Sequence, residues 1–230
     1  MIDSVHALDL GVASNIIGNI LYESIANRLW GGPNQDANAS LLEADLRGWE
    51  RRTRAGTRLQ GKLTVQRLKS ESGFPKLKAK GAQVRHLAEY ALTIARKFDS
   101  GSQHDRMKVA IAQLLCRVYQ CMSSSSQFFP APALTEFQTA GQKMLLILSA
   151  LHTAAVESGE RRWKFPPKGH LIDHMVSIQA REWGNPSYFW CYGDEDLVGQ
   201  CIEIARSCHP KTCVASALVK WLVLSFERDE

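Results

Sequence analysis

The sequence predicts a mainly α-helical, multi-helix protein with eight or nine helices and little or no sheet. Apolar residues recur every three or four positions over several long stretches, which is the period of an amphipathic helix. No segment alternates between apolar and polar residues over a useful length, and the best strand candidate, 189–192, is only four residues long. The chain has 230 residues, of which 45% are hydrophobic, so it can bury a core. We expect a single helical domain over 1–230.

Helix-start and helix-stop signals place the elements in order along the chain. A first helix is expected over 12–30, ended by the Gly-Gly-Pro-Asn sequence at 31–34. Ser40 and Glu43 have the spacing of a capping box, which predicts the start of a second helix. Later helices are predicted over 79–98, 103–122 and 133–158, around His170 and His174, from about Asp194, and after Pro210.

Charge is concentrated in one part of the chain. Residues 47–85 hold twelve Lys or Arg and two acids, a net charge of +10, whereas the whole chain carries +5 and the remainder therefore −5. Such asymmetry indicates a polyanionic partner, and we predict DNA bound through its phosphates. Trp49 and Phe74 lie in the same stretch and are expected to be buried rather than stacked on bases. The predicted DNA-binding residues are Arg47, Arg51, Arg52, Arg54, Arg58, Lys62, Arg67, Lys69, Lys76, Lys78 and Lys80.

The amino-terminal residues do not resemble a signal peptide, and no apolar run reaches the roughly 18 residues that a membrane span needs. We therefore expect an intracellular protein without a membrane partner, whose six cysteines are reduced thiols. A zinc-stabilised helical domain is an alternative. It requires at least three ligands to converge among Cys191, Cys201, Cys208, His209 and Cys213.

Two sets of motifs stand at opposite ends of the chain. Asp3 and His6 form D-x-x-H, followed by Leu-Gly-Val at 10–12 and Ile-Ile-Gly at 16–18. Far along the chain come Pro-Lys-x-His-Leu-x-x-His at 167–174, Gly-x-Pro at 184–186 and the acidic residues 194–196.

In this order the motifs resemble the catalytic domains of CACTA-type and Kyakuja–Dileera–Zisupton-type transposases. The resemblance covers roughly residues 1–25 and 163–205 and implies an RNase H-like fold with a helical insertion. It divides the chain into a D-x-x-H segment (1–30), a basic helical insertion (31–160) and a segment carrying an acidic ligand (161–230). We therefore expect the helical insertion and carboxy-terminal helices of such a core, with most of its sheet missing.

The resemblance also implies metal-dependent strand cleavage and transfer in a nuclear protein. Asp3 and Glu195 would be two of three carboxylates that hold Mg²⁺ or Mn²⁺, and His6 would lie beside them as a catalytic residue. Asp194 and Asp196 flank Glu195, so which of these acids is the ligand is open. The family's first catalytic Asp would precede Asp3 and is absent here, so we expect the chain to be inactive alone. The expected protein partner is then a second copy of this chain in a homo-oligomer, or another chain that supplies the missing part.

A different class of function explains the same residues without catalysis. Asp3 can begin a solvated helix, and the acids at 194–196 can be an N-cap with first-turn acids. His170 and His174, four residues apart, can be a structural pair, lie near a nucleic-acid site, or bind one metal together with Asp173. The alternative is a non-catalytic helical nucleic-acid-binding or scaffold protein.

Overall fold

The computed structural model describes residues 1–71 and 73–226, without the side chains of 193–197, 222 and 224–226. These residues form helices, turns and loops and no strand, which confirms the mainly helical fold. They divide into two compact units, Met1–Trp190 and Cys191–Glu230, where the sequence analysis expects a single domain. Within the described chain, no helix is long and apolar enough to cross a membrane.

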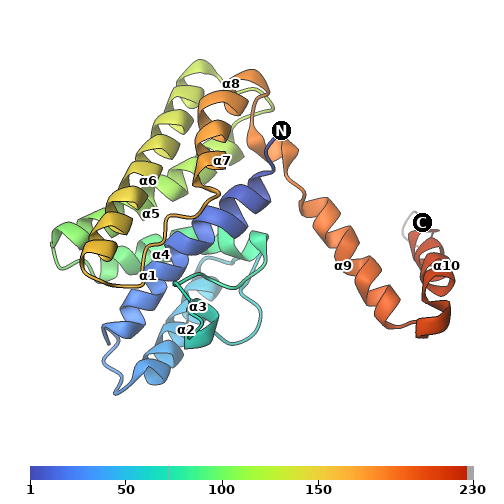
Figure 1. The fold of residues 1–230 in the computed structure, drawn as a ribbon, viewed down its shortest axis with the longest axis horizontal. Helices are drawn as coiled ribbons and strands as arrows, with labels where there is room; N and C mark the ends of the chain where they lie inside the picture. The colour runs from blue at the N-terminus through green and yellow to red at the C-terminus, as the bar shows by residue number, and fades with distance from the viewer. Residues whose placement is uncertain (72, 227–230) are drawn as a thin grey trace. The chain divides into compact units, whose positions relative to one another are not determined.

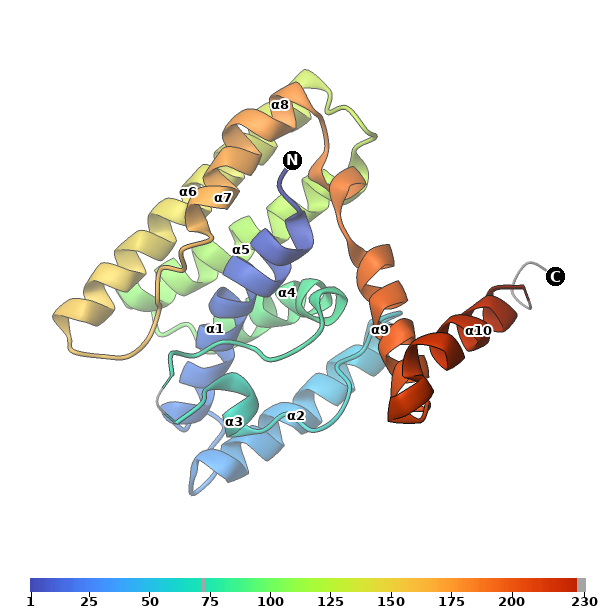
Figure 2. The same ribbon diagram turned by 45° about the vertical axis from the view of Figure 1, so that its right-hand side comes forward.

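The core of the first unit is built around its first two helices. A π-helix, η1 (Val5–Ala13), continues directly into α1 (Ser14–Ala26), so the helix predicted over 12–30 begins earlier and ends earlier. Almost every residue of the pair is buried, because later helices of the first unit pack around it. Figures 1 and 2 show this pair, in blue, in the middle of the first unit.

The second helix, α2 (Gln35–Arg52), starts earlier than the predicted capping box. Asn34 is its N-cap and accepts a hydrogen bond from the Ala37 N–H at 2.9 Å. Ser40 lies inside the helix, and its hydroxyl donates to the Asp36 carbonyl at 3.0 Å. The capping-box prediction was therefore wrong, because Asn34 already satisfies the first-turn donors one turn earlier.

Helices of increasing length complete the scaffold of the first unit. They are α3 (Val65–Leu68), α4 (Gly81–Lys97), α5 (Gln103–Ser124) and α6 (Ala131–Glu157). The last three match the predicted helices to within a few residues at each end. Helices α5 and α6 pack side by side as a hairpin (Figure 1).

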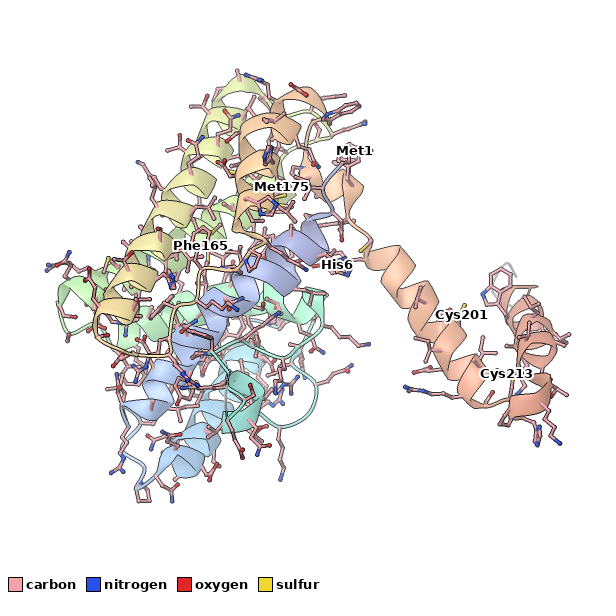
Figure 3. The ribbon with its side chains drawn as sticks, in the orientation of Figure 1. Met1, His6, Phe165, Met175, Cys201 and Cys213 are labelled. Carbon is pink, nitrogen blue, oxygen red and sulfur yellow. The ribbon has the colours of Figure 1, made fainter. Side chains whose placement is uncertain are left out.

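A broken helix follows the loop after α6 and ends the first unit. It consists of α7 (Gly169–His174), the π-helix η2 (Met175–Gln179) and α8 (Ala180–Glu182), with Met175 labelled in Figure 3. The predicted Gly-x-Pro turn follows, and Gly184 has a φ of +91°, which favours glycine. A 3₁₀-helix, η3 (Pro186–Phe189), occupies the start of the strand candidate 189–192, and no strand forms there.

The second unit is a helical hairpin. Helix α9 (Tyr192–Arg206) is joined through a 3₁₀ turn, η4 (Pro210–Thr212), to α10 (Cys213–Phe226). The Lys220 ammonium donates to the Ser207 hydroxyl at 3.0 Å and to its carbonyl at 3.3 Å, which satisfies the end of α9. Cys201 and Cys213 lie on the two helices of this hairpin (Figure 3).

Candidate nucleic-acid interface

The cationic side chains predicted to contact DNA lie between Arg47 in α2 and Lys80, the N-cap of α4. Three of the eleven, Arg47, Arg67 and Lys69, are half-buried. Within the described part of the chain, no carboxylate forms an ion pair with any of the other eight. These eight exposed residues, called the basic surface below, are Arg51, Arg52, Arg54, Arg58, Lys62, Lys76, Lys78 and Lys80.

Arg47 holds the loop that follows α2. Its guanidinium donates to the carbonyls of Leu59 and Gly61, both at 2.6 Å, and to the Glu50 carboxylate at 3.0 Å. Glu50 is 1% exposed and also accepts from the Leu59 N–H at 2.8 Å. A buried carboxylate thus pairs with Arg47 and fixes the loop backbone, so this arginine has a structural role that the charge count does not reveal.

Arg67 fastens the same loop from its other side. Its guanidinium donates to the carbonyls of Lys78 at 2.8 Å and Lys62 at 3.1 Å, and also to that of Gln60. Lys69 lies with its ammonium 4.9 Å from the centre of the Tyr22 ring. The three half-buried cations therefore have partners within the protein, and the exposed eight are the better candidates for a ligand.

The two aromatic residues of this stretch differ in their surroundings. Trp49 is buried and packs against His86 and Tyr90, with ring centres 5.1 and 5.3 Å apart. Phe74 is half-buried, and the Lys164 ammonium lies 5.6 Å from its ring centre. Neither ring is an exposed platform for stacking on bases.

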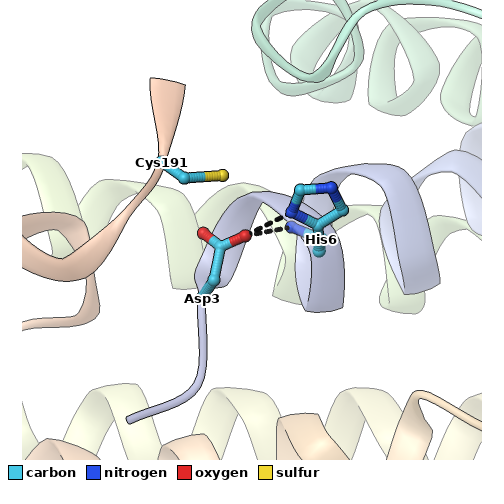
Figure 4. Close-up of side chains that lie close together, drawn as sticks. All are labelled: Asp3, His6 and Cys191. Atoms are coloured by element: carbon cyan, nitrogen blue, oxygen red, sulfur yellow. Dashed lines mark hydrogen bonds and ion pairs between the residues drawn. The ribbon is translucent and has the colours of Figure 1, made fainter. Parts of the chain in front are cut away.

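Asp3 and His6 form a pair at the start of η1 (Figure 4). One carboxylate oxygen of Asp3 accepts from the Val5 N–H at 3.0 Å, and the other accepts from the His6 N–H at 3.1 Å. The His6 Nδ1 lies 2.5 Å from that second oxygen. Asp3 therefore caps the first helical turn and orients the imidazole, whose side chain is 54% exposed.

The motifs from the two ends of the chain meet at this helix. The Lys168 ammonium donates to the His6 carbonyl at 2.9 Å. The Gln179 side chain accepts from the Ile2 N–H at 2.6 Å and donates to the Ile2 carbonyl at 3.1 Å. Residues more than 160 positions apart in the sequence are thus held together at the amino-terminal end of η1.

A two-metal site needs more carboxylate ligands than Asp3 alone provides. Mg²⁺ and Mn²⁺ take several oxygen ligands, and a two-metal site needs carboxylates that bridge the ions. Among the described residues, no second carboxylate has a ligand atom within 4.8 Å of those of Asp3 and His6. Glu195 lies on α9, but its side chain is outside the described residues. The described residues do not assemble a two-metal site by themselves, and the predicted pairing of Asp3 with Glu195 lies outside them.

Two other metal sites were considered from the sequence, one at His170 and His174 and one at the carboxy-terminal cysteines. The described residues form neither of them. His170 and His174 are exposed, and the His170 Nδ1 donates to the Pro167 carbonyl. These two histidines and Asp173 do not bring three ligand atoms within 4.8 Å of one another. The cysteines of the second unit and His209 do not bring three of their own ligand atoms within 4.8 Å of one another either. The described residues therefore form neither the His-Asp site nor the zinc site considered from the sequence.

A buried ionic cluster on α1 is a feature that the sequence analysis missed. Glu23 is 1% exposed, and its carboxylate lies 2.9 Å from the His104 Nε2 and 3.1 Å from the Lys108 ammonium. It also accepts from the Trp163 indole N–H at 2.5 Å. Burial alone would raise the pKa of Glu23, but the His104 hydrogen bond and the Lys108 charge outweigh burial and hold that pKa below its ordinary value.

A second missed feature could be read from the sequence. Along 75–81, buried Pro75, Leu77 and Gly81 alternate with exposed Lys76, Lys78 and Lys80. The period of two puts Lys76 and Lys78 on the side opposite buried Leu77, and the backbone bends at Ala79 before Lys80. The segment is short and forms no strand, so it does not meet the usual criteria for a strand.

Comparison with protein-family models, with curated protein sequences and with solved structures finds no match for this chain.

Proposed function

We propose that this chain binds DNA through the phosphate backbone, using the basic surface, as the helical part of a transposase-like core. The observation that carries the proposal is that eight exposed cations lie within thirty consecutive residues and that no carboxylate of the described residues pairs with them. Cationic side chains that are not neutralised within the fold attract a polyanion and release its counterions. Contacts of this kind position the protein on DNA and do not read its sequence. A nuclear location follows if the ligand is chromosomal DNA.

The salt dependence of DNA binding tests this function. The fluorescence anisotropy of a labelled duplex of arbitrary sequence is measured with the whole chain at several salt concentrations. Each phosphate contact contributes a slope of about −0.9 to log K against log salt. Replacing Arg51, Arg52, Arg54 and Arg58 together by Gln should make the slope shallower by about 3.6 if each residue contacts one phosphate.

A matched control separates location from total charge. Arg28, Arg96, Lys143 and Arg181 are also exposed, lie outside the basic surface, and when replaced by Gln remove the same four charges. Their variant should keep a slope close to that of the unmodified chain. Equal losses in the two variants, or no binding by the unmodified chain at low salt, would contradict the proposal.

The contact between Lys168 and His6 supports the transposase resemblance, because it joins the two motif sets that define it. Among the described residues no second carboxylate joins Asp3 and His6, which favours a chain that does not cleave DNA alone. Supercoiled plasmid incubated with the chain and Mg²⁺ or Mn²⁺ should therefore stay intact. Nicking that disappears in Asp3→Asn would contradict this inference and favour a catalytic core.

A further inference from the structure

Small residues on one face of η1 and α1 bring two distant basic segments together. A side chain at Gly18 would lie 2.6 Å from the Lys76 Cα, and one at Gly11 would lie 3.2 Å from the Lys168 Cδ. Between them, the Ser14 carbonyl accepts from the Leu77 N–H at 2.8 Å. These three positions follow the i, i+3, i+7 spacing of one helix face. The backbone around Lys76 and the stem of Lys168 therefore rest on the same surface.

Segment 161–168 is anchored beside this face by Trp163. Its side chain is 1% exposed, and its backbone N–H donates to the Asn19 side-chain oxygen at 2.8 Å. Burial of the indole leaves the next residue, Lys164, exposed, with its ammonium over the Phe74 ring. Lys164 thus stands next to the segment that carries Lys76.

The ammonium groups of Lys76 and Lys168 oppose one another electrostatically. The pKa of Lys76 is lowered, first by partial burial and then by the charge of Lys168. No described carboxylate forms an ion pair with Lys76, Lys164 or Lys168. Holding like charges together without an acid costs free energy, which an anion bound across them would recover.

We propose that Lys164 and Lys168 are phosphate-binding residues that extend the basic surface, so that a DNA strand crosses from Lys76 onto segment 161–168. The inference rests on the proposed function and adds a second, sequence-distant part to it. A phosphate backbone is favoured as the ligand because Lys76, Lys78 and Lys80 are exposed at alternate positions along one short segment. A repeated anionic ligand can contact such a row and then Lys164 and Lys168 in turn.

The same anisotropy titration, applied to the whole chain, tests the extension. Lys164→Gln together with Lys168→Gln should make the salt slope shallower by about 1.8, since two phosphate contacts are lost. Lys143→Gln together with Arg181→Gln removes two exposed charges elsewhere and should leave the slope unchanged. The inference would be overturned if the salt slope became shallower to the same extent in both double variants, or in neither of them.

Lys168 is half-buried, packs on Gly11 and donates to the His6 carbonyl, so its replacement could act through the fold. Lys164→Gln alone avoids this problem, because the described contact of its ammonium is the one with the half-buried Phe74 ring. This variant should make the salt slope shallower by about 0.9 without changing the midpoint of thermal unfolding. Lys168→Arg should keep the slope, since the charge remains. If Lys168→Arg makes the salt slope as shallow as Lys168→Gln does, then position 168 acts through packing, and its assignment as a phosphate ligand is wrong.

Two outcomes separate this inference from the proposed function. If the unmodified chain does not bind the duplex, the proposed function fails. Suppose that it binds and that the salt slope becomes shallower in the four-arginine variant but not in the Lys164 and Lys168 variants. In that case only the extension fails. Tighter binding of poly-glutamate than of DNA at equal salt would overturn the assignment of a phosphate ligand.

Discussion

Two groups of cations in the first unit differ in what neutralises them. His104, Lys108 and Arg162 converge on the carboxylate of Glu23, which is almost completely buried. The eight cations of the basic surface are exposed and have no ion-paired acid among the described residues. The first group completes its electrostatics within the protein, and the second does not. Matched charge therefore marks residues that hold the fold, whereas unmatched charge marks residues available to a ligand.

The largest expected effect comes from removing the acid of the matched group. Glu23→Ala removes the buried carboxylate and leaves Lys108, which is 6% exposed, with Asp105 as its remaining acid. Breaking a buried pair in this way costs about 3–5 kcal/mol of unfolding free energy. Urea unfolding followed by tryptophan fluorescence measures it. Glu136→Ala is the control, because Glu136 pairs with Arg117 at an exposed position and should cost less than about 1 kcal/mol.

Acid should weaken the same cluster. The pKa of Glu23 is lowered in the folded protein, so its contribution is present above the unfolded value and is lost as pH falls through the folded value. The pKa of Asp105, which pairs with Lys108, is also lowered: burial opposes the shift, and the hydrogen bonds from Lys108 and Ser100 outweigh it. Stability should therefore drop below about pH 4, near the unfolded carboxyl values.

Unfolding midpoints measured between pH 7 and pH 2 check this dependence. Glu23→Gln should be less stable at neutral pH and should lose less stability on acidification, since one of the titrating groups is gone. Parallel pH curves for the two proteins would contradict the role given to Glu23.

The face that supports the basic segments provides a smaller effect. Gly18→Ala places a methyl group 2.5 Å from the Leu77 backbone nitrogen, so the 75–77 segment must move. Overpacking of this kind costs about 1–3 kcal/mol. Gly48→Ala is the matched control on α2, where the close neighbour is the flexible end of Arg52, and helix propensity favours alanine. If both variants keep the stability of the unmodified chain, then the 75–77 segment is not held against Gly18.

Within the basic stretch itself, Arg47 and Arg52 should behave differently. Arg47→Gln removes a charged donor from the buried Glu50 and two loop carbonyls, a loss of about 1.5–3 kcal/mol. Arg52→Gln removes an exposed charge and should change stability by less than about 0.5 kcal/mol. Thermal or urea unfolding of the two variants compares them directly, and equal losses would contradict the distinction between fastening and exposed cations.

Some of this organisation could be predicted from the sequence, and the reasons for the rest are physical. Helices α4, α5 and α6 follow from local apolar periodicity, and the concentration of positive charge follows from composition. Neither the burial of Glu23 nor its partners could be predicted, because His104 and Trp163 lie 81 and 140 positions away. Arg47 was indistinguishable from Arg52 for the same reason, since its main acceptors belong to a loop that folds back on α2.

The smallest expected effect on stability per replaced residue belongs to the four-arginine variant of the basic surface. Removing Arg51, Arg52, Arg54 and Arg58 breaks no described ion pair, and it lessens repulsion among neighbouring cations. Each replacement should change the unfolding free energy by less than about 0.5 kcal/mol, although the salt slope of DNA binding falls. Urea unfolding at low and high salt measures this, and salt should narrow any difference, because it screens the repulsion. A large loss of stability would mean that these arginines hold the fold as Arg47 does, and the contrast between matched and unmatched charge would fail at the residues that define it.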